Sequence, residues 1–232
     1  MSVEADMDSV NPQQVERESL RAQANRGELI ERIARAVRQD GRVEPLEGLR
    51  LHRVSSPTES IHGMSGFAFC VTAQGSKEVL LGNTRYQYDP DHYLLTTAEL
   101  PVVSQIIEAS QARPYLSVRL ALDPTLVGSV MVEAGYLSPR SDAAVRAMNV
   151  SPLDASLLDA VVRLVRLLDT PAEAPFLAPL ITQEIVFRLL MGEQGDRLRH
   201  IAVQGGHTHR IGRAIERLRN EFDQPHRMDD IA

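Results

Sequence analysis

Short alternating runs of apolar and polar residues fill positions 49–122, a pattern that predicts β-strands. The clearest example is a hairpin in which Gly82 and Asn83 separate two such runs, because both residues tolerate the positive φ of a two-residue turn. Turn residues also stand at 75–76 and 89–91. Seven short strands without helical inserts predict one antiparallel β unit, a sandwich or a barrel.

After residue 122 the apolar spacing becomes helical. An Asp-Pro pair at 123–124 predicts a capped helix that ends at Gly135, and 136–150 is interpreted as a polar connection. A second cap at 151–154 opens a helix with a wide apolar stripe. The next helix, up to Gly192, is apolar almost all round, so we expect it to be buried on more than one side.

The N-terminal residues, up to about Ala24, show no clear period and predict a mobile arm or a poorly packed helix. Asn25, with Glu28 three positions later, predicts a capping box. Apolar residues then recur at helical spacing until Gly41. A short amphipathic helix is therefore expected ahead of the β unit.

The C-terminal residues begin with a Gly-Gly joint at 205–206. One apolar stripe then shares a helix with Arg210, Arg213, Arg217 and Arg219. A basic amphipathic helix of this kind is either a solvated face or a surface that contacts the DNA backbone. Residues 228–232 have the pattern of the opening turn of another helix.

Composition narrows the class of protein. Hydrophobic residues make up 43% and charged residues 24%, which excludes a disordered or collagen-like chain. The acidic start lacks the regions of a signal peptide, and no apolar stretch approaches the ~20 residues that cross a bilayer. We therefore expect a cytoplasmic protein without a membrane partner. The net charge of -6 argues against a chain that is mainly a nucleic-acid-coating surface, but it leaves room for one small basic module.

The order of motifs resembles one family. The motifs are QGSKEVLLGNTRYQYDPDHYLLTTAELPV, PYLSVRLALDP, SPLDASLLDAVVRLVRLLD, LAPLITQEIVFRLLMG and HTHRIGRAIERLRNEFDQPHRMDDIA. In this order they resemble the AraC-type (AraC/XylS family) transcriptional regulators with a cupin-like N-terminal domain. The resemblance implies a β-barrel sensor, a helical dimerisation segment and a DNA-binding domain of paired helix-turn-helix units, of which this chain holds only the start.

The resemblance and the patterns together give the expected organisation. The fold class is α+β, an antiparallel cupin-like β-barrel followed by a helical dimerisation segment. We expect an N-terminal arm and short helix at 1–41, the sensor at 42–122, the dimerisation segment at 123–204, and the linker with a truncated helix-turn-helix start at 205–232. Recognition helices read the base edges, and they are missing from a truncated helix-turn-helix start. The chain alone is therefore expected to bind DNA weakly or not at all. Contacts of Arg210, Arg213 and Arg217 with the DNA backbone would position the protein without specifying sequence.

Catalytic chemistry has little support in the sequence. Metal-binding cupins cluster their histidines, whereas His52, His62 and His92 stand singly on different segments. One His-x-His, at 207–209, lacks an obvious third ligand, and Cys70 is read as an inert thiol without an activating motif. We therefore expect no catalytic residues, no metal and no cofactor. A cupin-type metal-dependent enzyme remains the alternative, together with a ligand-free dimerisation module.

A barrel without catalysis can enclose a small-molecule effector. Because side chains alternate across a strand, only about half of the polar candidates can point inward. The candidates for ligand binding are His52, Arg53, Phe69, Tyr86, Tyr88, Tyr93, Gln105 and Arg119. Arg119 lies on the strand face opposite Leu116, Val118 and Leu120, so the pattern leaves a solvent-facing position open.

The expected partners are DNA, through the full-length protein, an unknown effector and a second copy of the chain. The stripe of Leu157, Val161, Leu164 and Leu168 is either intramolecular core or the homodimer interface. Two-fold regulators pair two DNA readers on two half-sites, which favours the interface. The expected function is effector sensing that modulates sequence-specific DNA binding.

Overall fold

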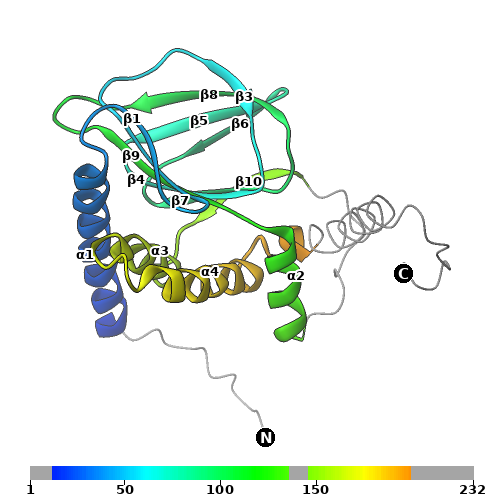
Figure 1. Cartoon of the computed structure of the whole chain (residues 1–232). Helices are drawn as coiled ribbons and strands as arrows, with labels where there is room; N and C mark the ends of the chain where they lie inside the picture. Colours follow the sequence, from blue (N-terminus) through cyan, green and yellow to red (C-terminus); the bar gives the residue numbers. More distant parts are fainter. Residues whose placement is uncertain (1–11, 136–145, 200–232) are drawn as a thin grey trace, which may run out of the picture.

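Residues 12–135 and 146–199 are described by the computed structural model, and they form a layer of helices, a six-stranded sheet and a four-stranded sheet (Figure 1). The helices are α1 (Pro12–Ala36), α2 (Pro124–Glu133), α3 (Ala155–Arg166) and α4 (Ala174–Met191), with a 3-10 turn η1 (Leu167–Asp169) after α3. The strands are β1 (Gly41–Leu46), β2 (Leu49–Val54), β3 (Ile61–Met64), β4 (Ala68–Gln74), β5 (Ser76–Leu81), β6 (Thr84–Tyr88), β7 (His92–Thr96), β8 (Pro101–Glu108), β9 (Tyr115–Ala121) and β10 (Met148–Pro152).

All described strand pairs are antiparallel, which confirms the expected α+β class. The larger sheet has the order β1-β2-β9-β4-β7-β10 and the smaller one β3-β8-β5-β6. Because the hydrogen bonds define two separate sheets, the cupin-like body is a sandwich. Figure 1 shows the larger sheet between the smaller sheet and the helices.

The predicted turns are confirmed. The hairpin joins Leu81 to Thr84 through a two-residue turn in which Gly82 has a φ of 56° and Asn83 keeps a negative φ. Only the first turn position therefore uses the left-handed region. The Asp89 carboxylate accepts a hydrogen bond from the amide of Asp91 at 2.9 Å.

Two of the three predicted helix caps behave as expected. The Asp123 carboxylate accepts from the amide of Thr125 at 2.8 Å, and Pro124 occupies the first turn of α2. The Asp154 carboxylate accepts from the amide of Leu157 at 2.8 Å and opens α3. Each aspartate satisfies an amide that has no partner within its helix.

The predicted start of the first helix is wrong. Helix α1 begins at Pro12, so Asn25 lies in its interior and caps nothing. The side chain of Asn25 is 8% exposed and donates a hydrogen bond to the Asp159 carboxylate of α3 at 3.3 Å. A tertiary partner therefore replaces the local cap that the spacing of Asn25 and Glu28 suggests.

Strand β10 is the second departure from the sequence pattern. Met148–Pro152 forms the edge of the larger sheet and pairs with β7, with Ser151 opposite Tyr93. The prediction of a polar connection is therefore wrong for Met148–Val150, where Met148 is 1% exposed. The three strand residues Met148–Val150 follow a polar stretch and are too few to show the alternation of apolar and polar residues that marks a strand.

The main core lies between the helices and the larger sheet. Helix α3 is buried along most of its length, and Leu29 and Ile33 of α1 are fully buried against the same cluster. A smaller cluster between the sheets contains Val79, Tyr86, Tyr88, Leu94 and Met148. The helices thus cover one face of the larger sheet, and the smaller sheet covers the other.

Helix α4 is buried on one side only, which corrects the expectation of burial on several sides. Ile185, Val186, Leu189 and Leu190 face the core, whereas the large apolar side chains Phe176, Leu177, Leu180, Phe187 and Met191 are exposed. Among the described residues, α4 is also the one helix with the length and composition to cross a membrane, at a mean hydropathy of 1.3. Core helices of globular proteins meet the same criteria.

Candidate functional site

A cavity of about 230 Å³ lies between the two sheets. Both sheets contribute to its wall, and polar side chains are as prominent there as apolar ones. Its charged and polar lining includes Arg42, Arg50, His52, His62, Lys77, Tyr88, Thr96, Ser104, Tyr115, Ser117 and Arg119. Val79, Leu94, Val102 and Met148 form apolar parts of the wall, and Cys70 lies among them.

Strand register explains why these side chains meet. One row across β2, β9, β4 and β7 places Arg50, Arg119, Cys70 and Leu94 side by side on the inner face of the larger sheet. The alternate residues of the same strands point to the helices, because side chains alternate across a strand. The apolar face of β9 is therefore the helix-facing one, and its polar face lines the cavity.

The cavity brings together three of the eight sequence candidates. His52, Tyr88 and Arg119 line it. The other five, Arg53, Phe69, Tyr86, Tyr93 and Gln105, do not.

Each of these five has another place in the fold. Phe69 and Tyr93 belong to the core under the helices, where their rings meet edge to face at 5.3 Å between centroids. Arg53 Nε lies 3.9 Å from an Asp40 carboxylate oxygen. Tyr86 packs in the smaller core, and Gln105 of β8 stands opposite Glu78 of β5.

Lys77 is a cavity residue that the sequence did not single out as a candidate. It lies on β5 directly opposite Tyr88 and faces the cavity. A signal was present, because Lys77 is the only lysine in a chain whose Lys and Arg total 25. Arg42, Tyr115 and Ser117 were missed as well, and no comparable signal marks them.

The electrostatics of the cavity are one-sided. Four lining side chains are basic, namely Arg42, Arg50, Lys77 and Arg119, and no aspartate or glutamate among the described residues lines the cavity. Arg50 is paired with Glu44 at 3.1 Å. Lys77 and Arg119 form no ion pair with any residue that the structure describes. Burial lowers the pKa of Lys77, and the charges of Arg42 and Arg119 lower it further.

His52, Tyr115 and Cys70, which also line the cavity, have shifted pKa values. Burial, with Arg42 and Lys77 as lesser causes, lowers the pKa of His52 to about 4. The His52 ring stands edge-on to Tyr115, 5.8 Å between centroids. Burial also raises the pKa of both Tyr115 and Cys70. The tyrosine hydroxyl and the thiol therefore stay protonated, and Cys70 lacks the thiolate that a nucleophile needs.

Metal ligands do not converge in the described ranges 12–135 and 146–199, where no group of three or more His, Cys, Asp and Glu side chains could hold an ion. His52 and His62 both line the cavity, whereas His92 lies outside it and contacts Asp89 at 2.8 Å. The His-x-His at 207–209, the joint at 205–206, and Arg210, Arg213 and Arg217 lie outside the described residues.

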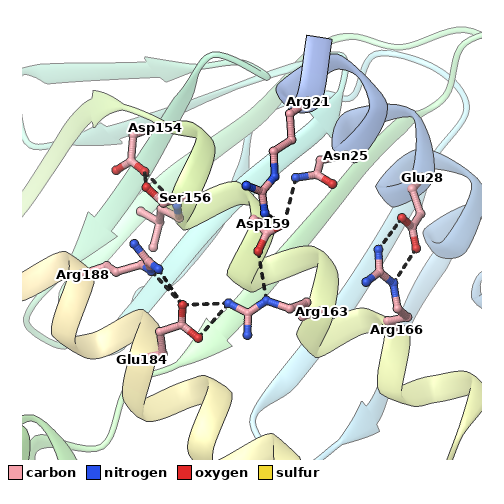
Figure 2. A network of polar contacts seen from close by, with 11 residues as sticks. Arg21, Asn25, Glu28, Asp154, Ser156, Asp159, Arg163, Arg166, Glu184 and Arg188 are labelled. Carbon is pink, nitrogen blue, oxygen red and sulfur yellow. Dashed lines mark hydrogen bonds and ion pairs between the residues drawn. The ribbon is translucent and has the colours of Figure 1, made fainter. Parts of the chain in front are cut away.

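A polar network fastens α1 to the other helices (Figure 2). Glu28 of α1 accepts two hydrogen bonds from Arg166 of α3, at 2.9 and 2.7 Å. Arg163 of α3 donates to Glu184 of α4 at 2.7 Å, and Glu184 also accepts from Arg188. The three helices are therefore tied together by charge-assisted hydrogen bonds as well as by the core.

The predicted dimer stripe is occupied within the chain. Leu157, Val161 and Leu164 are each 2% exposed or less, and Leu168 is partly buried against the same core. These side chains are buried in the core where α3 packs against α1 and α4, so they offer no surface to a second copy. Five of the eleven exposed large apolar side chains of the described residues lie instead on α4.

Solved structures with a related arrangement are forms of ToxT from Vibrio cholerae. An apo ToxT variant aligns at 9% identity with a TM-score of 0.45, covering 83% of this chain and 70% of that one. Wild-type ToxT with bound unsaturated fatty acid aligns at 8% identity and 0.47, covering 79% and 66%. ToxT bound to (E)-4-(8-methylnaphthalen-1-yl)but-3-enoic acid aligns at 10% identity and 0.46, covering 79% and 68%.

Among curated proteins, no sequence matches this chain. The family model for the AraC-type transcriptional regulator N-terminus matches residues 45–197, about two thirds of the chain. That span runs from the end of β1 through α4, so it includes strands β2 to β10 and most of the cavity lining. The chain belongs to the family of AraC-type transcriptional regulators and contains their N-terminal domain.

Proposed function

We propose that the chain is the effector-sensing part of a cytoplasmic AraC-type regulator, and that a small molecule in the inter-sheet cavity modulates DNA binding by a C-terminal helix-turn-helix domain. The cavity between the sheets carries this proposal. Natural ligand sites combine apolar walls with a few polar groups that fix orientation, and this cavity has both. At about 230 Å³ it is smaller than most drug-sized pockets, which favours a compact effector.

The larger sheet supplies a physical route from the cavity to the helices. Its strands β2, β4 and β9 line the cavity with one face and pack against α1 and α3 with the other. A packed sheet does not deform continuously, so a ligand that favours one strand arrangement favours one arrangement of the helices. The resulting shift is limited by the difference in ligand affinity between the two arrangements.

Homodimerisation through α4 is part of the same proposal. The exposed apolar side chains on this helix, Phe176, Leu180, Phe187 and Met191, are an unusual group for a monomer. A symmetric pair of such helices would bury them and place two DNA readers for two half-sites. The expected division also stays a proposal: an N-terminal arm and helix at 1–41, the sensor at 42–122, dimerisation at 123–204 and the helix-turn-helix start at 205–232.

A thermal-shift screen of metabolites on this chain tests ligand binding, because a ligand that binds only the folded state raises the melting temperature. Ser117→Phe places a large ring in the cavity and should abolish the shift by any hit. Ser110→Phe, in the exposed β8–β9 turn, is the matched control that should keep it.

The regulatory step needs the full-length regulator. A hit from the screen should change its operator affinity in a gel-shift series at fixed salt. A hit that saturates the cavity and leaves operator affinity unchanged would refute the modulation. The metal-dependent enzyme alternative predicts stoichiometric metal in the purified protein, and the ligand-free dimerisation alternative predicts no hits at all.

A further inference from the structure

The single lysine of the chain occupies the cavity. Arginine serves at every other basic position of the 232 residues, including all the surface ion pairs described among the helices. Lysine carries a compact point charge with three rotatable donors on a flexible stem, whereas arginine offers a broad, planar fork. The lone lysine, at an inward-facing position of β5, therefore presents a compact positive charge to the cavity.

Arg119 provides the second cation. It extends from β9 on the opposite sheet, so the two charges approach the cavity from its two walls. Gly66 lies beside it, and a Cβ at this position would come within 3.3 Å of the Arg119 guanidinium nitrogen Nη2. The glycine therefore leaves room for the guanidinium at the cavity wall.

Both cations lack a counter-ion in the described part of the chain. Desolvating a charge without a partner is costly, and proteins normally pair such charges or let them neutralise. No carboxylate lines the cavity, and Arg42 adds a further positive charge next to Lys77. The missing negative charge therefore has to come from a bound molecule or from solvent.

The other residues of the cavity wall indicate the chemistry of the rest of the bound small molecule. Val79, Leu94 and Met148 offer apolar surface next to the cations. The hydroxyls of Tyr88 and Tyr115 stay protonated because burial raises the pKa of both, so they can donate hydrogen bonds to an anion.

We propose that the cavity binds a compact organic acid, with its carboxylate between Lys77 and Arg119 and its apolar body against Val79, Leu94 and Met148. This inference rests on the proposed effector-sensing function and names the chemical class of the effector. Inorganic phosphate and sulfate share the charge but cannot use the apolar wall, so they bind more weakly than an acid of matching size.

Pairs of acids and their neutral amides test the charge requirement. Benzoate with benzamide and hexanoate with hexanamide differ in the head group and share the apolar body. By calorimetry on the full chain, we expect at least one acid to bind about tenfold to hundredfold more tightly than its amide. Inorganic phosphate serves as the probe for charge alone. Equal binding of acid and amide, or binding of phosphate as tight as that of the acids, would overturn the inference.

Two variants locate the carboxylate. Lys77→Met and Arg119→Met keep side-chain bulk and remove the charge, so each should abolish the preference for acid over amide while amide binding persists. Arg113→Met, in the exposed β8–β9 turn, is the control that should keep the preference. A preference that survives both cavity variants would overturn the placement.

The lone lysine permits a direct spectroscopic readout. Reductive methylation with ¹³C-formaldehyde labels one lysine side chain, so its pH titration is read from a single lysine signal. An acid bound next to Lys77 raises the pKa of its amine, whereas an acid bound elsewhere leaves the titration unchanged and overturns the inference.

The two proposals fail in different ways. Neutral molecules that bind wild type and are excluded by Ser117→Phe, without any acid preference, would overturn the carboxylate and leave effector sensing intact. The absence of binding by acids, amides and the metabolite panel alike would overturn both.

Discussion

The bond between Glu28 and Arg166 offers a stability test with a defined pH signature. Arg166, and to a lesser degree Arg32, lower the pKa of Glu28 from 4.5 to about 2. A shift of this size corresponds to about 3 kcal/mol as an upper limit. Solvent screening reduces it, because the Glu28 and Arg166 side chains are 29% and 48% exposed. We expect Glu28→Gln, which keeps the shape and removes the charge, to lower the free energy of unfolding at pH 7 by about 1–2 kcal/mol.

The sign of the pH dependence follows from the depressed pKa. The stabilisation by ionised Glu28 is present above its unfolded value of 4.5 and is lost as pH falls toward about 2. Urea denaturation of wild type and variant at pH 7, 5 and 3 should therefore show a difference that shrinks to half or less by pH 3. Glu31→Gln, at an exposed position of the same helix, is the matched control and should change stability little at any pH.

A double-mutant cycle separates the pair from its surroundings. Combining Glu28→Gln with Arg166→Gln should give a coupling energy of about 0.5–1.5 kcal/mol at pH 7. A coupling near zero, or a difference between wild type and Glu28→Gln that stays constant down to pH 3, would refute the reasoning. In that case the apolar core around Leu29 and Ile33, together with the hydrogen bonds of Arg21 and Asn25 to Asp159, would hold α1 on α3.

Three further predictions concern the turn, the cavity and the surface. Gly75→Ala should lower the free energy of unfolding, measured by urea denaturation, by about 2–4 kcal/mol, because φ is +82° and the new Cβ would come within 2.3 Å of the Glu108 carbonyl oxygen. The control Gly82→Ala, where φ is +56° and the Cβ meets open space, should lower it by about 1 kcal/mol. Lys77→Met should raise the melting temperature of the ligand-free protein, because it removes an unpaired desolvated charge; a lower melting temperature would count against this account of Lys77. Leu180→Asp should shift sedimentation toward monomer by at least about tenfold in dissociation constant, whereas Leu20→Asp, at an equally exposed site on α1, should not.

Features encoded within a few residues were predictable. The caps at Asp123 and Asp154 and the turn at Gly82 depend on neighbours two or three positions away, and all three are where the sequence places them. Asn25 shows the limit of such signals. Its spacing to Glu28 fits a capping box, but Asp159, far along the chain, provides the partner that keeps Asn25 inside a helix.

The candidate site was only partly predictable because alternation does not say which face of a strand is the interior. The apolar face of β9 suggests a core and its polar face suggests solvent, yet both are covered. Leu116 and Leu120 belong to the core under the helices, whereas Ser117 and Arg119 line the cavity. The same ambiguity placed Phe69 and Tyr93 among the ligand candidates, although both belong to the core under the helices.

The apolar composition of α4 did not predict how much of the helix is buried. A helix that is apolar all round is expected to be buried all round, but the main neighbours of α4 in the described chain are α2, α3 and η1. Its inner side, with Ile185 and Leu189, completes the core, and Phe176 at 78% exposure and Leu180 at 60% gain nothing from folding. This exposed side of α4 is the surface that the proposed homodimer would cover, and Leu180→Asp tests that contact.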